Sequence, residues 1–519
     1  MQTWKDILNR YPAIDDIYQA GTAAIVSDSA AADFFNLYGI YAHSIEKLET
    51  ALFFVAREYT DNTVQKALII IGSSPANSAF EGCAETICGI DTLRCTFSHK
   101  NASALRKYFP YTAPICLRSK KITIGLGDRL GLASAGHIRL IRNYDVSPVL
   151  AQQSIRELNL TGRTYENVLD DVSFAVFQEG YKNGYGADGD HLKTAEEVKM
   201  ALDTGFTMLT LDCSEHIDNS VAALDEDAIH ERYIALPQIV KDNFEQKYLG
   251  IQKAGVHCFD LSLPVLQKIV LTYNKAIDFA ENIYKSFFQE DGDVVFELSI
   301  DETLTPTDPE AHFIVAAELL DRGVRIDNLA PRFCGEFQKG IDYIGKIDQF
   351  LNEFRIHCAI ADHFGYKISV HSGSDKFAVF KIVGEETHGR YHLKTAGTNW
   401  LEAVRTVAQV NPGLYRKMHA FALANIDEAK KYYHISAQAN QIPDIENMAD
   451  DELPSLMDQV DARQFLHITY GLILNAGQRE DYCKDFYATL NTHESNYYSS
   501  LILHIGKHLD TLGVPKITP

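Results

Sequence analysis

Between about residues 120 and 410, short β-branched runs end in polar or glycine residues, and a helical pattern follows each of them. This alternation is typical of β/α units. It predicts an α/β fold class with a TIM-like (β/α) barrel, although a doubly wound sheet produces similar text. An eighth strand is expected but has no obvious position. The seven clear runs are KITIGLGDRLG (121–131), VSFAVFQEGYKNGYGADGDH (172–191), FTMLTLDCSEH (206–216), DVVFELSIDET (293–303), NLAPRFCGEF (328–337), YKISVHSGSDK (366–376) and RYHLKTAGT (390–398).

The two ends of the chain show other patterns. Residues 1–115 mix amphipathic helical text, such as SIEKLETALFFVAREY (44–59), with the strand candidate KALIIIG (66–72), and predict an N-terminal α/β extension. The barrel is assigned to 116–411. It carries a helical insertion at about 217–292, where the spacing between strands is too long for one helix. Residues 412–519 predict a helical C-terminal region that packs on the barrel or forms an oligomer contact.

Charge and composition exclude some classes of function. The 48 Lys and Arg residues against 70 Asp and Glu give a formal net charge of -22. Such a surface repels nucleic acid but can still bind a small anion where cations converge locally. No charged-then-apolar leader and no apolar stretch of about 18 residues is visible, so we expect a cytoplasmic protein without membrane contact. The nine cysteines form no CxxC pair, which favours reduced and mostly buried thiols.

Polar residues at the strand ends are the first candidates for chemistry, because the carboxyl ends of barrel strands share one mouth. Side chains alternate along a strand, so every second residue points inward. The alternation groups Glu297 with Ser299 and Asp301, Arg332 with Cys334 and Glu336, Lys367 with Ser369 and His371, Asp212 with Ser214 and His216, and His392 with Lys394. Carboxylates, imidazoles and cations are therefore expected to converge.

Buried carboxylates and histidines in such number are costly unless a cation neutralises them. We therefore predict a divalent transition metal, because imidazole and carboxylate ligands without a cysteine set suit Zn, Mn, Ni, Fe or Co. The preferred ligands are His191, Glu336 and His371, which come from three different strands and leave open positions for a substrate. Other available ligands are His363, His388 and His392.

Two of these features have structural alternatives. His191 follows the glycine-rich stretch YKNGYGADGD, in which Asp188 and Asp190 could simply cap the following helix. Glu297 and Asp301 form either an acid/base pair or an internal salt-bridge layer with Arg332. The sequence alone leaves both questions open.

The GLGDRLG segment (125–131) looks like a phosphate loop but lacks the Walker lysine and the GxGxxG order. We therefore do not expect a nucleotide there. Asp128 and Arg129 remain strand-end candidates, and Asp128 is taken as a substrate contact.

Five long motifs carry a resemblance to a known family: GLGDRLGLASAGH (125–137), YGADGDHLKT (185–194), FELSIDETLTPT (296–307), LAPRFCGEFQKGIDYIG (329–345) and VHSGSDKF (370–377). They resemble the tagaturonate epimerase family over roughly residues 120–400. The resemblance implies a metal-dependent enzyme that interconverts D-tagaturonate and D-fructuronate, and some relatives act on the matching neutral ketohexoses. The expected partner is a small anionic sugar, and a homo-oligomer is possible.

The chemistry of that reaction suggests roles for the strand-end residues. The two uronates differ at the carbon β to the ketone, whose C–H bond is not acidified, so retro-aldol cleavage and re-addition explain the reaction better than α-proton exchange. Glu297 and Asp301 would serve as base and acid, and Arg332, Lys376 or Lys394 would hold the substrate carboxylate. Direct proton transfer by the same two carboxylates is the alternative mechanism. An aldolase or sugar isomerase, or a non-catalytic sugar-acid sensor, are the alternative functions.

Overall fold

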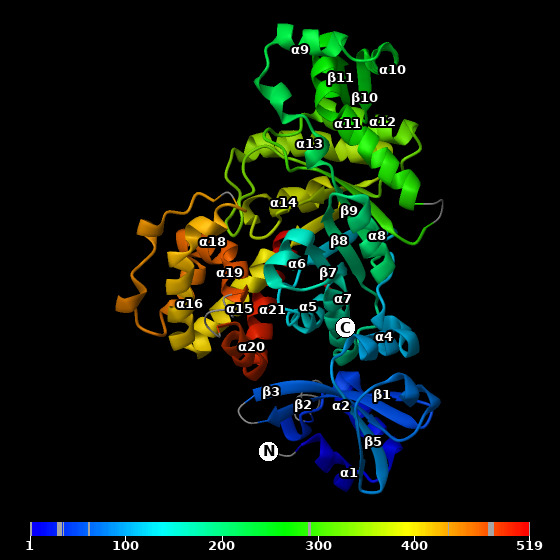
Figure 1. Ribbon diagram of the computed structural model, residues 1–519, viewed down its shortest axis with the longest axis vertical. Helices are drawn as coiled ribbons and strands as arrows, with labels where there is room; N and C mark the ends of the chain where they lie inside the picture. Colours follow the sequence, from blue (N-terminus) through cyan, green and yellow to red (C-terminus); the bar gives the residue numbers. More distant parts are fainter. Residues whose placement is uncertain are drawn as a thin grey trace.

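The computed structural model describes residues 3–517 except 28–33, 35, 61–62, 289–291, 434 and 476–481. Figure 1 shows a barrel between an N-terminal sheet at the bottom and an insertion at the top, with the C-terminal helices on the left. None of the helices described is both long and apolar enough to cross a membrane.

Eight parallel strands close the central barrel in chain order, so the predicted TIM-like barrel is confirmed. The strand that the sequence did not place is β7, in which only Val149, Leu150 and Ala151 are apolar. The run at 172–191 was predicted too early, because its first residues end a helix and the strand begins at Gly186. The strands are β6 (Ile122–Leu126), β7 (Ser147–Ser154), β8 (Gly186–Leu192), β9 (Met208–Asp212), β12 (Val295–Ile300), β13 (Asn328–Pro331), β14 (Lys367–Val370) and β15 (Tyr391–Thr395).

Helices surround the barrel and pack on the outward-facing side chains of its strands. Phe296, Leu298 and Ile300 of β12 lie in this outer core, as their alternation predicts, while Glu297 and Ser299 face inward. The helices are α5 (Ser134–Ile141), α6 (Ile155–Thr161), α7 (Tyr165–Gln178), α8 (Ala195–Thr204), α11 (Leu263–Phe287), α12 (Pro309–Asp321), α13 (Ile347–Phe364), α14 (Phe377–Glu386) and α15 (Gly397–Val410).

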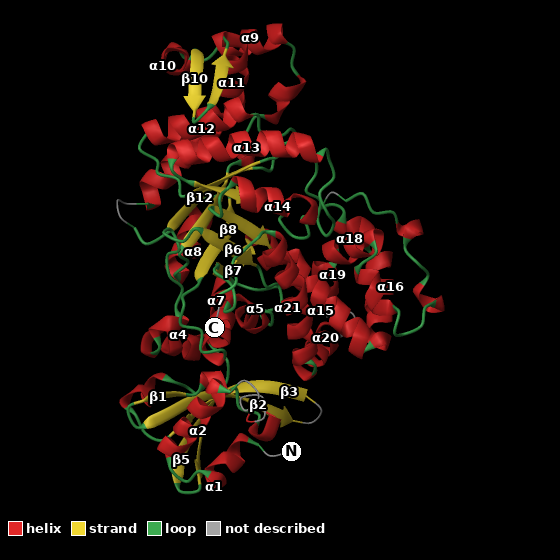
Figure 2. Cartoon of the chain, turned by 180° about the vertical axis from the view of Figure 1, so that it is seen from behind, coloured by secondary structure: helices red, strands yellow, loops and turns green. Residues whose placement is uncertain are grey.

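The insertion lies between β9 and β12 and is not entirely helical (Figure 2). It includes the antiparallel hairpin of β10 (Gly250–Ala254) and β11 (His257–Leu261) beside α9 (Glu226–Ile234) and α10 (Gln238–Tyr248). Its predicted second helix is α11, which leads back to β12 as a helix of the barrel and buries Ile269, Val270 and Ile277 in the barrel's core.

The N-terminal part contains an antiparallel sheet in the order β1-β2-β3-β5-β4. The helix predicted at 44–59 was wrong, because Leu52 and Phe54 pack on one side of the sheet while Phe53 and Val55 pack on the other. An apolar run buried on both faces has no helical or strand periodicity to separate the two. The elements are α1 (Ile7–Arg10), α2 (Ile14–Val26), β1 (Glu46–Leu48), β2 (Ala51–Thr60), β3 (Thr63–Ile71), β4 (Cys83–Ile87), β5 (Ile90–Cys95) and α4 (His99–Tyr108).

The C-terminal residues form a helical layer around α15 with its own apolar cluster. Tyr498 and Leu501 of the last helix approach Gly136 of α5 closely, which anchors this layer on the barrel. The helices are α16 (Pro412–Ala424), α17 (Ile426–Ala429), α18 (Val460–Ile468), α19 (Tyr470–Asn475), α20 (Tyr482–Thr492) and α21 (Glu494–Thr511).

Candidate functional site

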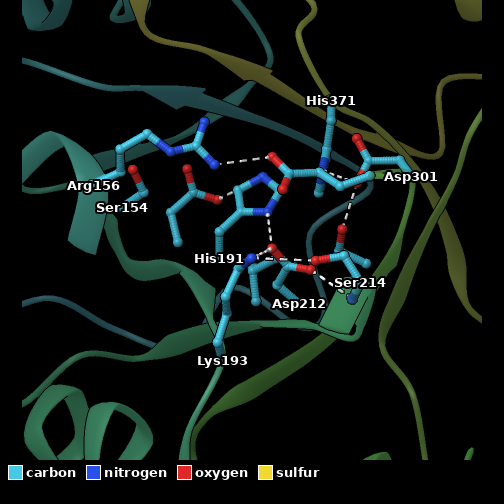
Figure 3. A network of polar contacts seen from close by, with 12 residues as sticks. Ser154, Arg156, His191, Lys193, Asp212, Ser214, Asp301 and His371 are labelled. Atoms are coloured by element: carbon cyan, nitrogen blue, oxygen red, sulfur yellow. Dashed lines mark hydrogen bonds and ion pairs between the residues drawn. The ribbon is translucent and has the colours of Figure 1, made fainter. Parts of the chain in front are cut away.

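A cavity of about 460 Å³ opens at the carboxyl ends of the barrel strands. This is the face on which barrel enzymes place their active sites, and the volume is typical of a small-molecule site. Acidic, basic and imidazole side chains from β8, β15 and the loops after β12, β13 and β14 line it. Figure 3 shows three of them, His191, Asp301 and His371.

Lys394 of β15 neutralises the carboxylates of the barrel interior. Its Nζ lies 2.7 Å from Asp188 Oδ2, 2.7 Å from Asp190 Oδ1 and 3.0 Å from Glu297 Oε1. Burial alone would lower the pKa of Lys394, but these three carboxylates hold it well above its usual range. Asp188 and Asp190 therefore face inward and do not cap the next helix, which Thr194 and Glu197 cap instead.

Glu297 lies under the floor of the cavity and does not line it. Its Oε1 accepts from His371 Nε2 at 2.7 Å, and its Oε2 accepts from Asn328 Nδ2 at 3.1 Å. The side chain is fully buried. These partners occupy both oxygens, so the predicted catalytic carboxylate is placed to hold His371 and Lys394 in position.

His371, Asp301 and His191 come together at the mouth. Two of them, His191 and His371, were predicted from the sequence as metal ligands. His371 Nδ1 lies 3.2 Å from Asp301 Oδ1, and the two imidazole rings are 5.0 Å apart. One atom from each of the three side chains lies within 4.8 Å of the others, which is close enough to bind one metal ion. Burial alone would raise the pKa of Asp301, but His371 holds it at about 2.

His191 reaches this group because β8 is irregular at its end. The register between β8 and β9 shifts between Gly189 and Leu192, and His191 has a φ of 54°. Such a bulge changes the direction of a side chain and is common beside active sites. His191 Nδ1 then lies 3.4 Å from Asp212 Oδ2. Figure 3 shows the two side chains directed toward each other.

Three buried atoms at this point make only ion-pair contacts and no well-aligned hydrogen bond among the residues described: Nδ1 of His191, Nδ1 of His371 and Oδ2 of Asp212. Burial alone would lower the pKa of His191, but the carboxylates around it, Asp190 first, raise it to about 10. An environment that stabilises an added positive charge so strongly, with unsatisfied imidazole and carboxylate atoms, fits a divalent transition metal. A second possible group, His191 with Asp212 and Glu302, shares the same imidazole.

Three predicted site residues, Glu336, Asp128 and Lys376, lie outside the group of His191, Asp301 and His371. Glu336 lines the cavity, but it is exposed, accepts from Gln338 Nε2 and belongs to none of the metal-binding groups found among the residues described. Strand β13 ends at Pro331, so the alternation that grouped Glu336 with its neighbours does not extend that far. Asp128 accepts three backbone N–H groups of its own loop, at Leu130, Gly131 and Ala133, and is not in the cavity wall.

Lys376 is also directed away from the cavity. It is fully buried, and its Nζ donates to the carbonyl oxygens of Gln338, Ile341 and Ser374 at 2.6 to 2.9 Å. All three protons are used, so this ammonium ties two loops together. Burial lowers the pKa of Lys376 to about 7.

Arg332 and Lys339 are cations of the cavity wall that pair with no carboxylate in the part of the chain that the structure describes. Lys339 Nζ donates to Ser372 Oγ at 3.0 Å, and burial lowers its pKa. The other arginines of the wall have acidic partners: Arg129 with Glu157 at 2.7 Å and Arg156 with Glu302 at 3.4 Å. Arg332 was predicted and Lys339 was missed, since Lys339 lies beyond the strand in a loop without periodicity.

The C-terminal layer also contributes to the cavity, which the sequence did not reveal. Tyr433 and His467 line it, and both ring nitrogens of His467 are buried without a hydrogen-bond partner among the described residues. A Cβ on Gly397 would lie 1.6 Å from His467 Nε2, so only glycine permits this close approach of α15 and α18.

Residues 41–512 match the tagaturonate epimerase family. The chain belongs to this family. The tagaturonate/fructuronate epimerase of Thermotoga maritima is 38% identical over 477 residues, which make up 92% of this chain and 97% of that relative.

Solved structures agree with this membership of the tagaturonate epimerase family. A glycerol-bound crystal structure of the fructuronate-tagaturonate epimerase of Cohnella laeviribosi is 48% identical, covers 95% of this chain and 100% of its own, and has a TM-score of 0.89. The native structure of the same enzyme is also 48% identical, covers 93% and 99%, and has a TM-score of 0.88. The resemblance seen in the five sequence motifs is thus confirmed.

Proposed function

We propose that this member of the family interconverts D-tagaturonate and D-fructuronate in the cavity at the barrel mouth. The observation that carries the proposal is that a possible metal-binding group, His191, Asp301 and His371, lines the same cavity as two cations. These cations, Arg332 and Lys339, have no carboxylate partner among the described residues. A ketouronate has a ketone with adjacent hydroxyls, which the metal would bind, and a remote carboxylate, which the two cations would bind.

Arg332 and Lys339 hold the substrate carboxylate in this proposal. Both line the cavity, and a carboxylate would supply the counter-charge that the described part of the chain does not give them. Lys394, which was predicted for this role, already neutralises three carboxylates of the interior. Lys376 donates all its protons to carbonyl groups. Neither has a proton free for the substrate.

His191, Asp301 and His371 would hold a divalent transition metal, since one ligand atom from each lies within 4.8 Å of the other two. A bound metal would supply Lewis-acid polarisation of the ketone. Glu297 keeps the His371 ring in place through the bond to Nε2, which leaves Nδ1 directed toward Asp301. Asp301 is thereby assigned to the metal group and not to proton transfer.

Asp190 is the base that the geometry favours. It lines the cavity next to His191, and although burial opposes it, Lys394 keeps the pKa of Asp190 below its usual range, so the carboxylate is ionised. Asp190 would take the proton of the hydroxyl on the β carbon as the bond between the α and β carbons breaks. The electron pair of that bond moves into the ketone fragment, which becomes an enolate. The aldehyde fragment turns, the enolate carbon adds to the other face of the aldehyde, and the new alkoxide takes back the proton held by Asp190. No atom is gained or lost.

The test is to incubate the purified protein with D-tagaturonate and to follow products by NMR. Formation of D-fructuronate until both uronates are present at equilibrium is expected, and Asp190→Asn should slow it by about a hundredfold or more. Accumulation of three-carbon fragments would assign an aldolase, and an aldose product would assign an isomerase. Binding of the uronate without any conversion, with each divalent transition metal added, would exclude an enzyme.

A further inference from the structure

A second cavity, of about 620 Å³, lies at the opposite end of the barrel from the candidate active site. Its walls come from the segments that precede strands β6, β12, β13, β14 and β15, including residues 118–121, 323–327 and 364–367. It is larger than the cavity at the mouth, and the epimerase reaction proposed above makes no use of it.

The charge of this second cavity is opposite to that of the whole chain. Six cations line it and Asp327 is the one carboxylate among its described lining residues, in a chain whose formal net charge is -22. Asp327 is already engaged, because its Oδ1 accepts from Arg118 Nε at 2.8 Å and its Oδ2 from the backbone of Phe296 at 2.9 Å. The cations are Arg118, Lys120, Lys121, Arg325, Lys367 and Arg390.

Most of this positive charge is not neutralised within the part of the chain that the structure describes. Arg390 pairs with Asp362 at 3.1 Å, but the side chains of Lys120, Lys121 and Arg325 have neither a hydrogen bond nor an ion pair there. Exposed lysines often lack partners on any surface, so these three residues alone would not indicate a ligand.

Lys367 is the residue that distinguishes this cavity from a solvated basic surface. It is 6% exposed, and its Nζ donates to two neutral acceptors, the carbonyl oxygen of Lys120 at 3.2 Å and Thr123 Oγ1 at 3.1 Å. A buried ammonium without a counter-ion is costly, because desolvation is not repaid by attraction to an anion. Burial lowers the pKa of Lys367 to about 8, in line with that cost.

One wall of the cavity is aromatic. Tyr284 and Phe288 of the α11 end stack with ring centroids 5.5 Å apart and an interplanar angle of 5°, and Phe296 packs against both. Cations facing a flat apolar wall are suited to an organic anion with a planar or apolar part. A phosphate group has nearly two negative charges and three acceptor oxygens, which matches several unpaired cations better than one carboxylate does.

We propose that this cavity, at the amino-terminal end of the barrel, binds a small phosphorylated organic metabolite. Its phosphate lies among Lys121, Arg325 and Lys367, and its apolar part lies against Tyr284 and Phe288. The site is separate from the epimerase centre and does not depend on the function proposed for that centre.

The probe is phenyl phosphate. Its binding to the intact, metal-loaded protein is measured by isothermal titration calorimetry at low ionic strength. Saturable binding that weakens with salt is expected, and benzoate and inorganic phosphate should each bind more weakly because one lacks the phosphate and the other the ring. Equal binding of benzoate would overturn the phosphate assignment, and equal binding of inorganic phosphate would overturn the role of the aromatic wall.

Substitutions at exposed positions show where phenyl phosphate binds, and uronate turnover shows that each variant is folded. The double variant Lys121→Ala/Arg325→Ala removes two exposed charges and should weaken phenyl phosphate about tenfold or more while uronate turnover stays unchanged. The matched control Lys199→Ala/Lys381→Ala, at two other exposed positions, should bind as the unaltered protein does. Lys339→Ala should also keep the affinity, because it lies at the mouth. Unchanged affinity in the Lys121/Arg325 variant, or loss in the Lys339 variant, would refute the proposal.

Discussion

Arg463 Nη2 lies 2.6 Å from Asp375 Oδ2, and this ion pair joins helix α18 of the C-terminal layer to the mouth loop after β14. Both side chains are buried. Arg463 Nε also donates to the carbonyl oxygen of Gly340 at 2.6 Å, so one guanidinium holds the loop after β13 as well. The C-terminal layer therefore fixes the two loops that present Lys339 and Ser372 to the cavity.

The same aspartate lies close enough to His504 and His508 to suggest a second metal site. The hydrogen bonds argue against it. His508 Nε2 accepts from the backbone N–H of Asp375 at 3.0 Å, and its Nδ1 donates to the carbonyl oxygen of His504 at 2.9 Å. Both nitrogens are used, so this cluster connects α21 to the mouth loop.

Removing the ion pair between Asp375 and Arg463 should impair substrate binding, although neither residue lines the cavity. Asp375→Asn leaves the buried Arg463 without a counter-charge and should destabilise the protein by about 3 to 5 kcal/mol, as measured by urea unfolding. In the fraction that folds, KM for the uronate should rise more than kcat falls, because the loops that hold the substrate lose their support.

A double-mutant cycle with Arg463→Met separates pairing from packing. The double variant should lose less stability than the two single variants together, since no unpaired charge remains. Asp362→Asn breaks an exposed pair with Arg390 and serves as the control. Strict additivity of the two losses would mean that the ion pair does not connect the layers.

The metal content of purified variants tests two proposed ligand sets, one inferred from the structure and one predicted from the sequence. We expect that chelation abolishes turnover and that a divalent transition metal restores it. His191→Ala, His371→Ala and Asp301→Asn should each reduce bound metal in the purified protein, whereas Glu336→Gln should keep it, because Glu336 stands outside the group. His216→Ala, at a histidine that stacks on Phe279, is the matched control. Metal loss in the Glu336 variant with full retention in the Asp301 variant would restore the original assignment.

Comparing a charged with a neutral substrate tests whether Arg332 and Lys339 bind the carboxylate. Lys339→Met and Arg332→Met each remove a charge-assisted hydrogen bond worth about 1.5 to 3 kcal/mol, which is roughly a tenfold to hundredfold loss in kcat/KM for the uronate. The loss for the corresponding neutral ketohexose should be much smaller. Lys376→Met is the contrast, since it disturbs the loops for either substrate and should lower both activities alike. If the two cavity variants also lower both alike, these cations do not bind the carboxylate.

The sequence predicted those parts of the site that depend on a single strand. His371 could be found because it follows a β-branched run directly, and Glu297 could be placed inward by alternation within β12. Glu336 lies outside the metal-binding groups of the described residues, because the alternation rule was extended past the end of β13. Which carboxylates Lys394 neutralises depends on three strands and their register, and no local pattern contains that information.

Other residues of the site could not be predicted because their positions depend on packing between segments far apart in the sequence. Arg463 lies 88 residues beyond its partner Asp375 in the sequence, and His467 approaches Gly397 of α15. Both lie on a helix with an ordinary amphipathic pattern. The bulge that turns His191 into the cavity is likewise visible only in the pairing of β8 with β9.

Isotope exchange tests the mechanism, because the epimerised carbon carries no acidic proton in the ground state. If the carbon–carbon bond breaks, the C–H bond at the β carbon passes intact through the aldehyde fragment. The epimer formed in deuterium oxide should then contain no deuterium at that carbon, as read by proton NMR and mass spectrometry. If Asp190 instead removed the proton from carbon, its carboxyl group would exchange with solvent between turnovers and deuterium would enter that position. The Asp190→Asn variant, given enough time to turn over, provides the control for slow non-enzymatic exchange. Stoichiometric deuterium at the β carbon would rule out the retro-aldol route and assign Asp190 to carbon acid chemistry, while the metal group and the carboxylate contacts would stand.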